Sequence, residues 1–246
     1  MSDRASHEVA HGRFLATEGP ESQWGWGTPA GRERADRRAK LIVEGARLSP
    51  ATRALEVGCG AGLFTEKFAR SGSHLVAVDI SPDLLALARA RGLNPERVRF
   101  VHRRFEECDV EGPFDAVIGS SVLHHLELDE ALTRILELLR PGGWLSFAEP
   151  NLLNPQVYLE RRFRRWFPYV SPDETAFTRS VLSKDLESAG FEAIDIQPFD
   201  WLHPSTPSAC IRLVDSLGRA VERVPGVREF AGSLAIRARK PESPEA

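Results

Sequence analysis

The chain has 246 residues, 42% of them hydrophobic and 27% charged, a composition typical of one large globular α/β domain or two small ones. Its 32 basic and 35 acidic side chains give a formal charge of −3, so no overall positive field draws the chain to nucleic acid. The basic residues are uneven, with 28 arginines and 4 lysines, which favours forked hydrogen bonding over point charges.

The cysteines and the first residues indicate a cytoplasmic protein. Cys59, Cys108 and Cys210 are an odd number and lack the spacing of a disulfide framework or a metal site, so no metal is expected. The N-terminal residues are charged and lack the apolar centre of a secretory signal. No apolar run approaches the ~18 residues of a membrane span.

Residues 1–27 show no sustained periodicity, and we interpret them as an arm that becomes ordered only against another part of the molecule. A helix is predicted to begin at Thr28-Pro29 and to end near Leu48, because threonine caps helices and proline suits the first turn. We therefore expect an N-terminal arm and lid over residues 1–40 and a main domain over residues 41–246.

Strands and helices alternate in the main domain. Strands are predicted at 54–57, 74–79, 97–101, 114–119 and 144–149, with helices between them at 62–70, 82–90 and 128–140. A later helix at 178–189, strand at 191–199, helix at 208–223 and strand at 233–239 complete the pattern. This order predicts an α/β fold, a doubly wound Rossmann-like sheet of seven strands with helices on both faces.

An insert at about residues 150–177 interrupts the alternation on the side where a substrate would bind, and contains the basic and aromatic run YLERRFRRWFPYV. At helical spacing, Phe163 and Phe167 share one face, with Tyr158 or Leu159 nearby. The arginine pairs flank this face. Such a surface suits anionic substrate groups, a membrane interface or RNA phosphates. The alternative is a solvated helix whose arginines pair with nearby acids such as Asp173 and Glu174.

The segment LEVGCGAG, at residues 55–62, lies between a predicted strand and a predicted helix. Its glycines permit a tight turn and a close approach of the backbone to a ligand, beside the free N–H groups of the following helix. The dinucleotide-binding pattern G-x-G-x-x-G is not met, because Leu63 occupies the place of its third glycine. Glu56 stands beside the loop, where a carboxylate suits a cationic ligand better than a pyrophosphate.

A second acid, Asp79, ends the second predicted strand. There it can accept hydrogen bonds from both hydroxyls of a ribose, or it can cap the helix that begins at Ser81-Pro82. LEVGCGAG, VAVDIS, FDAVIGSSVLHHL and LLRPGGWLSFAEP follow one another in family order, and over roughly residues 40–240 the chain resembles the class I S-adenosylmethionine-dependent methyltransferases.

The resemblance implies a mostly parallel sheet with an antiparallel last strand, and S-adenosyl-L-methionine as the cofactor, converted to S-adenosyl-L-homocysteine. It implies that Glu56 and the glycine loop hold the methionine part, that Asp79 binds the ribose and that Ile80 packs on the adenine. The cofactor-binding residues expected on this basis are Glu56, Gly58, Cys59, Gly60, Gly62, Asp79, Ile80, Phe105 and Ser120.

One position departs from the family pattern. Members commonly place an aspartate after the third strand, where it accepts a hydrogen bond from the adenine amino group, and Arg104 occupies that place here. Because an arginine cannot accept, the contact is expected from the backbone of Arg104 or Phe105, or from the carboxylate of Glu106 or Glu107.

Methyl transfer from a sulfonium requires the nucleophile, the methyl carbon and the sulfur in line, and requires a base only if the acceptor must lose a proton. His124 and His125 are the candidate bases, and the alternative is that they pack or bind cofactor without moving protons. The arm's tryptophans either close over the cofactor as a lid or fill the core. The residues expected to face the substrate are Trp24, Trp26, Glu149, Asn151 and Tyr158.

These observations predict a cytoplasmic methyltransferase that acts on a small or lipid-like molecule at oxygen or carbon. Nucleobase amines are disfavoured, because GSSVLH replaces the N-P-P-Y or D-P-P-Y motif of the members that methylate them. The alternatives are an RNA or protein methyltransferase, a protein that binds S-adenosylmethionine without turnover, and an NAD-dependent oxidoreductase. Nucleic acid is not expected as a partner, peripheral membrane contact is expected through residues 158–169, and the oligomeric state stays open.

Overall fold

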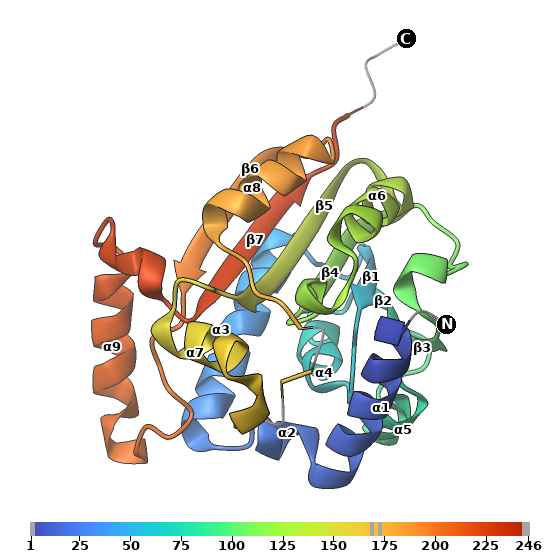
Figure 1. Cartoon of the computed structure of the whole chain (residues 1–246). Helices are drawn as coiled ribbons and strands as arrows, with labels where there is room; N and C mark the ends of the chain where they lie inside the picture. Colours follow the sequence, from blue (N-terminus) through green and yellow to red (C-terminus); the bar gives the residue numbers. More distant parts are fainter. Residues whose placement is uncertain (1–2, 168–169, 172–173, 243–246) are drawn as a thin grey trace.

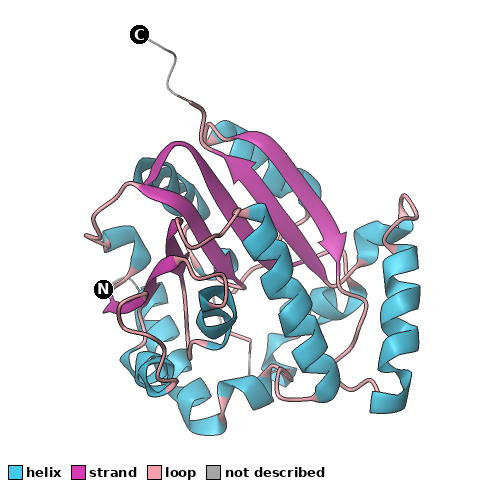
Figure 2. Cartoon of the chain, turned by 180° about the vertical axis from the view of Figure 1, so that it is seen from behind, coloured by secondary structure: helices cyan, strands magenta, loops and turns pink. Residues whose placement is uncertain are grey.

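The structure, a computed structural model, describes residues 3–167, 170–171 and 174–242. Its strands form one central sheet, and helices lie in front of the sheet both in Figure 1 and in the reverse view of Figure 2, so both faces are covered. The strands are β1 (Arg53–Val57), β2 (His74–Asp79), β3 (Val98–His102), β4 (Phe114–Ser120), β5 (Leu139–Pro150), β6 (Glu192–Phe199) and β7 (Ser233–Arg239).

The 7-stranded sheet has the order β3-β2-β1-β4-β5-β7-β6. Neighbouring strands from β3 to β5 run parallel, whereas β7 is antiparallel to both β5 and β6. The predicted doubly wound, mostly parallel sheet with an antiparallel last strand is therefore confirmed. In such a sheet the chain reverses its order between β1 and β4, and ligands bind beyond the carboxyl ends of the strands at that point.

The predicted helices of the main domain are also present. Thr28 caps α3 as expected, since its Oγ1 accepts a hydrogen bond from Gly31 N at 2.9 Å, and that helix ends at Gly45 rather than near Leu48. Among the helices of the described residues, none combines the length and the apolarity that a membrane crossing needs. The α-helices are α1 (Asp3–Glu18), α2 (Pro20–Gln23), α3 (Pro29–Gly45), α4 (Leu63–Ala69), α5 (Pro82–Ala90), α6 (Leu128–Leu138), α7 (Pro155–Arg162), α8 (Arg179–Ser188) and α9 (Ile211–Val221).

Both faces of the sheet are buried. Along β2, Leu75 packs into the cluster beneath α3 and α4, while its neighbour Val76 packs into the cluster beneath α6 and α8. Successive side chains of a strand point to opposite faces, so a strand covered on both sides is apolar at nearly every position. This burial explains why the strands appear as continuous apolar runs in the sequence, and it leaves the loops at the sheet edge as the place for a site.

The N-terminal arm is helical where the sequence predicted no regular structure. In α1, Leu15 is 2% exposed and packs against Ala61 and Leu84. At Gly12 a Cβ atom would lie 2.5 Å from Ser81 Oγ, so α1 rests directly on the segment between β2 and α5. The arm thus becomes ordered against the main domain, as interpreted, but its few apolar positions are too sparse to reveal a helix by periodicity.

The insert does not form the single helix that the spacing of its aromatic residues suggested. Helix α7 ends at Arg162, because Phe163 leaves the helical region with φ −122° and ψ 41°, and a short 3₁₀ turn, η3 (Arg164–Trp166), follows. No residue of α7 is buried, so no packed face holds the helix together beyond its eighth residue. Pro168, Tyr169, Pro172 and Asp173 lie outside the described residues.

Candidate functional site

A cavity of about 750 Å³ opens at the carboxyl ends of β1, β2 and β4. Its walls come from the loops after these strands, from α1, from residues 20–26 and from residues 201–205. Ligand-binding cavities commonly span about 300–1,000 Å³. The cavity therefore lies where the fold predicts a ligand and has a suitable size.

The glycine loop forms the floor of this cavity. Gly58, Gly60 and Gly62 all have left-handed backbone, with φ of 65°, 51° and 78°. A Cβ atom at Gly58 would lie 2.3 Å from a methyl group of Val122, so the loop also depends on the close packing of β1 and β4. The left-handed backbone at all three positions and the close approach of Val122 at Gly58 explain why the loop contains glycines.

Asp79 lies beside the loop and lines the cavity. Its Oδ2 accepts a hydrogen bond from Gly60 N at 2.7 Å, and its Oδ1 accepts one from Ser81 N at 2.8 Å. Burial raises the pKa of Asp79, while the hydrogen bonds from Ser81 and Gly60 lower it. Asp79 thus orders both loops, and each oxygen keeps a lone pair for a ligand. The Ser81 side chain, which accepts from Leu84 N, is the cap of α5.

Glu56 is 2% exposed and does not line the cavity. Burial raises its pKa to about 8, with the Thr65 hydroxyl lowering it and the charge of Asp79 raising it further. Within the described part of the chain, its Oε2 has no hydrogen-bond partner. The predicted role of Glu56 in holding the methionine part stays a prediction, and the carboxyl has an unused acceptor for a cationic ligand.

The remaining predicted cofactor residues divide into two groups. Gly62 begins α4 outside the cavity wall. Arg104 lines the cavity, but its guanidinium lies 3.1 Å from Glu106 and 3.0 Å from Glu107, so both acids already face a cation. The residues that line the cavity as predicted are Gly58, Cys59, Gly60, Asp79, Ile80, Phe105 and Ser120.

Arg38 is a site residue that the sequence did not reveal. It is 3% exposed on α3 and lines the cavity. Its Nη1 donates to Ser121 Oγ at 2.8 Å and to the carbonyl of Ala148 at 3.0 Å, while Nη2 donates to Ser233 Oγ. Burial lowers its pKa to about 10, although the charge of Asp200 raises it.

No carboxylate of the described residues forms an ion pair with Arg38, and its Nε has no hydrogen-bond partner among them. Asp200, the nearby acid, is already held by Arg34 through three hydrogen bonds of 2.6 to 3.0 Å. A buried cation whose direct hydrogen-bond partners are two hydroxyls and a carbonyl is only partly compensated by acids farther away. The wall of the cavity therefore presents a positive charge that a bound anionic group would balance.

Backbone strain marks the same place. Ser121, which accepts the hydrogen bond from Arg38, has φ 55°, and Asp200, which binds Arg34, has φ 81°. Left-handed backbone costs of order 1 kcal/mol or more in residues other than glycine, and such residues gather at binding sites. The chain thus holds both arginine partners in unfavourable backbone conformations at the cavity.

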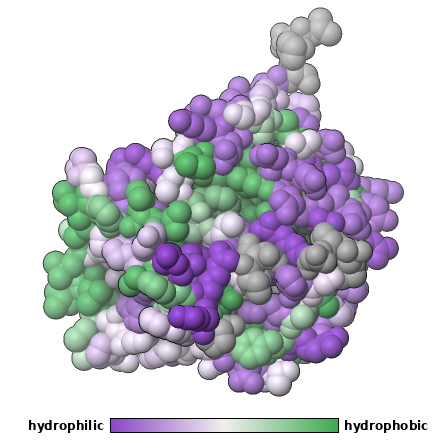
Figure 3. Space-filling view, viewed as in Figure 1, coloured by the Kyte–Doolittle hydropathy of each residue, from purple (hydrophilic) through white to green (hydrophobic). Residues whose placement is uncertain are grey.

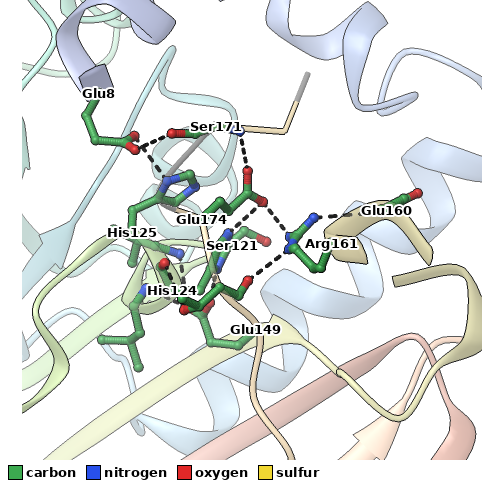
Figure 4. A network of polar contacts seen from close by, with 12 residues as sticks. Glu8, Ser121, His124, His125, Glu149, Glu160, Arg161, Ser171 and Glu174 are labelled. Carbon is green, nitrogen blue, oxygen red and sulfur yellow. Dashed lines mark hydrogen bonds and ion pairs between the residues drawn. The ribbon is translucent and has the colours of Figure 1, made fainter. Parts of the chain in front are cut away.

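His124 lies in a buried network of charged groups (Figure 4). Its Nδ1 is 2.5 Å from Glu149 Oε2 and its Nε2 is 3.1 Å from Glu174 Oε1. Burial lowers the pKa of His124, but the two carboxylates raise it to about 9. His124 is therefore held as a cation with both nitrogens engaged. This geometry favours the interpretation in which His124 packs without moving protons.

His125 also lines the cavity, and its Nδ1 lies 3.0 Å from Glu8 Oε2 on α1. Burial raises the pKa of Glu8, but the contact with His125 outweighs it and the pKa is lowered. Ser171 Oγ donates to the other oxygen of Glu8 at 2.6 Å (Figure 4). Glu8 thus joins the N-terminal helix to the loop after β4 through His125 and to the insert through Ser171.

His124, His125 and Glu174 bring their ligand atoms within 4.8 Å of one another, close enough to share a metal ion. Glu174 Oε1, however, also accepts from Arg161, and Glu149 lies against His124. The two buried carboxylates are thus matched by two cations of the chain itself. The cluster needs no metal ion for its charge balance.

The structure does not bring three of the predicted substrate residues to the cavity. Glu149 is 0% exposed and accepts hydrogen bonds from Val122 N and Leu123 N, both at 3.0 Å. Asn151 is buried and donates to the carbonyls of residues 229 and 231. Tyr158 is 53% exposed on the outer side of α7. Glu149 and Asn151 lie at the end of β5 and Tyr158 lies in the insert, as predicted. However, the first two side chains form hydrogen bonds with the backbone, and Tyr158 faces solvent.

The two tryptophans do line the cavity. The Trp26 ring packs edge-on against Phe64 at 5.6 Å, and the guanidinium groups of Arg34 and Arg38 lie 5.1 and 5.7 Å from its centre. Trp24 is 39% exposed at the same wall. Both positions agree with a role in covering a ligand, and Trp26 also holds the buried arginine in place.

The charge on His124 predicts a pH dependence of stability. Its pKa is raised from 6.5 to about 9, so the stabilisation is fully present below about pH 6.5 and is lost as the pH rises through 9. We expect urea unfolding to show about 3 kcal/mol less stability at pH 9.5 than at pH 6.5. His124→Gln should flatten this change and the exposed-site variant His74→Gln should not. An unchanged slope in His124→Gln would contradict the assignment.

The fold and the cavity together define a class of protein: an α/β domain with a doubly wound sheet and a ligand-sized cavity beyond the carboxyl ends of its central strands, beside a glycine loop and an acid at the end of β2. Residues 54–143 match the family model described as a methyltransferase domain. The chain therefore contains a match to a methyltransferase domain over its central residues, and it has the fold of S-adenosylmethionine-dependent methyltransferases of known structure.

Named relatives agree with this family. The chain is 30% identical over 148 residues to nodulation protein S of Rhizobium tropici, which covers 58% of this chain and 60% of that protein. It is 38% identical over 117 residues to the ubiquinone biosynthesis O-methyltransferase of Xanthomonas axonopodis pv. citri, covering 46% and 49%. The chain thus spans about half to three-fifths of these curated relatives.

A solved structure shows the same fold over nearly the whole chain. The N-methyltransferase NodS of Bradyrhizobium japonicum, crystallised with S-adenosylhomocysteine, has a TM-score of 0.63 and 21% identity. The alignment covers 96% of this chain and 99% of NodS.

Proposed function

We propose that this cavity binds S-adenosyl-L-methionine and that the protein transfers the methyl group of the sulfonium to a small or lipid-like acceptor. The observation that carries the proposal is the pair of charges in one cavity: Asp79 anchored on the glycine loop and Arg38 buried without a counterion. The ribose hydroxyls suit the free lone pairs of Asp79, and the carboxylate of the methionine part suits Arg38.

The rest of the cavity supports the same orientation. Ile80 and Phe105 supply apolar wall for an adenine. Glu56, whose Oε2 has no hydrogen-bond partner among the described residues, lies two residues before Gly58 but outside the cavity wall. The role of these residues is to place the sulfonium so that an acceptor can approach in line. S-adenosylmethionine supplies the methyl group when bound.

Helix α1, Trp24 and Trp26 act in this proposal as the lid expected over residues 1–40. Their support is that all three line the cavity and that Glu8 of α1 binds His125 and Ser171 across it. A closed lid excludes water from the reacting atoms.

Oxygen or carbon acceptors remain the first choice, and nitrogen is the second. The observation that favours nitrogen is that His124 has no free ring nitrogen. A neutral amine attacks with its own lone pair and needs no base before the transfer. The N-methyltransferase named among the structural neighbours supports the same choice.

The cofactor proposal is tested with Arg38→Met and two ligands. We expect the variant to bind S-adenosylmethionine about 10- to 100-fold more weakly, because a charge-assisted contact is worth about 1.5–3 kcal/mol. Binding of 5′-methylthioadenosine, which lacks the amino-acid part, should change by less than about twofold. Calorimetry measures both, and Arg32→Met on the exposed side of α3 is the matched control.

If Arg38→Met weakened the binding of both ligands equally, Arg38 would stabilise the cavity without contacting the amino-acid part of the cofactor. Tighter binding of NADH than of S-adenosylmethionine would overturn the cofactor. Turnover is followed separately as release of S-adenosylhomocysteine with hydroxyl, enol and amine acceptors. If S-adenosylmethionine bound but no S-adenosylhomocysteine were released with any acceptor of that panel, the protein would bind the cofactor without being an enzyme.

A further inference from the structure

Helix α9 carries an apolar face that no described part of the chain covers. Leu213 is 63% exposed and Leu217 is 58% exposed. Residues four apart lie on one side of a helix, so the two leucines form one stripe. In the turn that follows, Val224 is 46% exposed. Large apolar side chains gathered in this way mark interaction surfaces.

The opposite side of α9 fixes the helix to the body of the protein. A Cβ atom at Gly218 would lie 2.8 Å from Trp201 Cβ, so the helix backbone lies against that side chain. One turn later, Glu222 accepts hydrogen bonds from both Nη atoms of Arg37. These contacts hold the inner side of α9, which lies at the edge of the molecule (Figure 1), and the exposure of Leu213 and Leu217 places the leucine stripe on its solvent side.

The apolar surface continues beyond α9. Val227 is 45% exposed and Phe230 is 49% exposed in the 3₁₀ turn η5 (Val227–Phe230). Asn154, the cap of α7, donates to the carbonyl of Phe230 at 2.9 Å, and its neighbour Leu153 is 42% exposed. Figure 3 shows green hydrophobic residues gathered at the left, where Figure 1 places α9 and the segment after it. We call this surface the α9 face; its members are Leu153, Leu213, Leu217, Val224, Val227 and Phe230.

The charges on the α9 face are basic. Arg212 precedes Leu213 and Arg223 precedes Val224, both are exposed, and neither forms an ion pair within the described residues. The acids of this part of the chain, Asp215 on α9, Glu222 just after it and Glu229 in η5, are paired with other arginines. The surplus charge of the face is therefore positive.

The insert carries residues of the same character. The rings of Phe163 and Trp166 stack at 5.3 Å, and Trp166 is 66% exposed. Arg162 and Arg165 beside them are exposed and form no ion pair with a described acid. Aromatic side chains with flanking arginines are typical of segments that lie at the interface of a bilayer.

We propose that the α9 face docks on an anionic lipid bilayer. A helix with an outward apolar stripe and unpaired arginines lies in the plane of such an interface, with its apolar side among the acyl chains. A second copy of the chain fits less well, because a two-fold contact would bring the surplus arginines of two identical faces into one interface. RNA would leave the leucine stripe uncovered.

The cavity opens next to this surface. Val157 and Arg161 of α7 line the cavity, as do residues 201–205, which lead into α9. A docked protein would thus present the cavity to molecules dissolved in the bilayer. This last step rests on the proposed function and narrows its acceptor to one that partitions into lipid, whereas docking itself does not depend on cofactor or turnover.

Vesicle flotation tests the proposal with the full chain. We expect co-flotation with phosphatidylcholine vesicles that contain phosphatidylglycerol, and loss of it in phosphatidylcholine alone or at high salt. Arg212→Gln with Arg223→Gln should weaken partitioning about fivefold for each arginine. Leu213→Gln with Leu217→Gln should weaken it on the order of tenfold. Leu87→Gln with Arg89→Gln, exposed on α5, is the matched control and should float like the parent chain.

Calorimetry with S-adenosylmethionine on the same variants separates the two proposals. A chain that binds the cofactor but does not float overturns docking alone, and a chain that floats without binding cofactor overturns the proposed function alone. Flotation that is equal in all variants assigns lipid binding to another surface. Sedimentation as a dimer that Leu213→Gln with Leu217→Gln converts to a monomer assigns the face to a second copy.

Discussion

Asparagine at position 79 is expected to weaken S-adenosylmethionine binding about 100-fold. The carboxylate of Asp79 serves the ligand and also accepts from Gly60 N and Ser81 N, which approach to 2.7 and 2.8 Å. An asparagine has one oxygen in place of two and carries no charge, so charge-assisted contacts worth about 3 kcal/mol are lost. Calorimetry should record the same loss for 5′-methylthioadenosine, in contrast to the Arg38→Met variant.

The control for this variant is Asp109→Asn, at an acid whose side chain is 79% exposed in the loop after β3. It should leave both affinities within about twofold. Thermal unfolding without ligand shows whether the loops survive in Asp79→Asn. If a folded Asp79→Asn variant bound S-adenosylmethionine within threefold of the parent chain, Asp79 would not be the residue that binds the ribose.

Alanine at position 149 is expected to destabilise the protein by about 3–5 kcal/mol. The change leaves the His124 cation with one carboxylate fewer and strands the N–H groups of Val122 and Leu123, all of them buried. Urea unfolding at pH 7 measures the loss. The exposed-site variant Glu130→Ala, on α6, should change stability by less than about 0.5 kcal/mol.

Glu149→Gln separates charge from hydrogen bonding in the same network. The amide oxygen can still accept from the backbone of residues 122 and 123, but the charge that raises the pKa of His124 is gone. We therefore expect a stability between those of the parent chain and Glu149→Ala, with less loss between pH 6.5 and 9.5. Equal stability of all three proteins would show that the network contributes little.

The parts of the fold that were predicted are those with a strong local pattern. The alternating strands and helices from β1 to β7 follow from apolar runs, glycine turns and caps such as Thr28, and most were found within a few residues. The exception is β5, which begins at Leu139, five residues before its predicted start, because the Pro-Gly-Gly segment continues the strand. Helix α1 was missed because its order comes from packing on α5 at Gly12 and Leu15. The insert was given one helix because the spacing of its aromatic residues does not report the break at Phe163.

The site divides in the same way. Residues fixed by backbone geometry, such as Gly58 and Asp79, were found because their position after a strand determines where they lie. Arg38 was missed because an arginine in an amphipathic helix is normally exposed. Its burial depends on the Trp26 and Phe199 rings that pack against it, which are distant in sequence. For Glu149, the position was right, but the choice between facing the cavity and facing His124 is made by tertiary packing.

The contact between α1 and the main domain also has a consequence for comparing relatives. A Cβ atom at position 12 would lie 2.5 and 2.7 Å from the Oγ and Cβ atoms of Ser81, so any side chain larger than hydrogen would lift α1 away from α5. Glycine at this position is thus a marker that can be read from an alignment. Homologous chains with a side chain there must hold their N-terminal helix in another position, and their cavities will be enclosed by different residues.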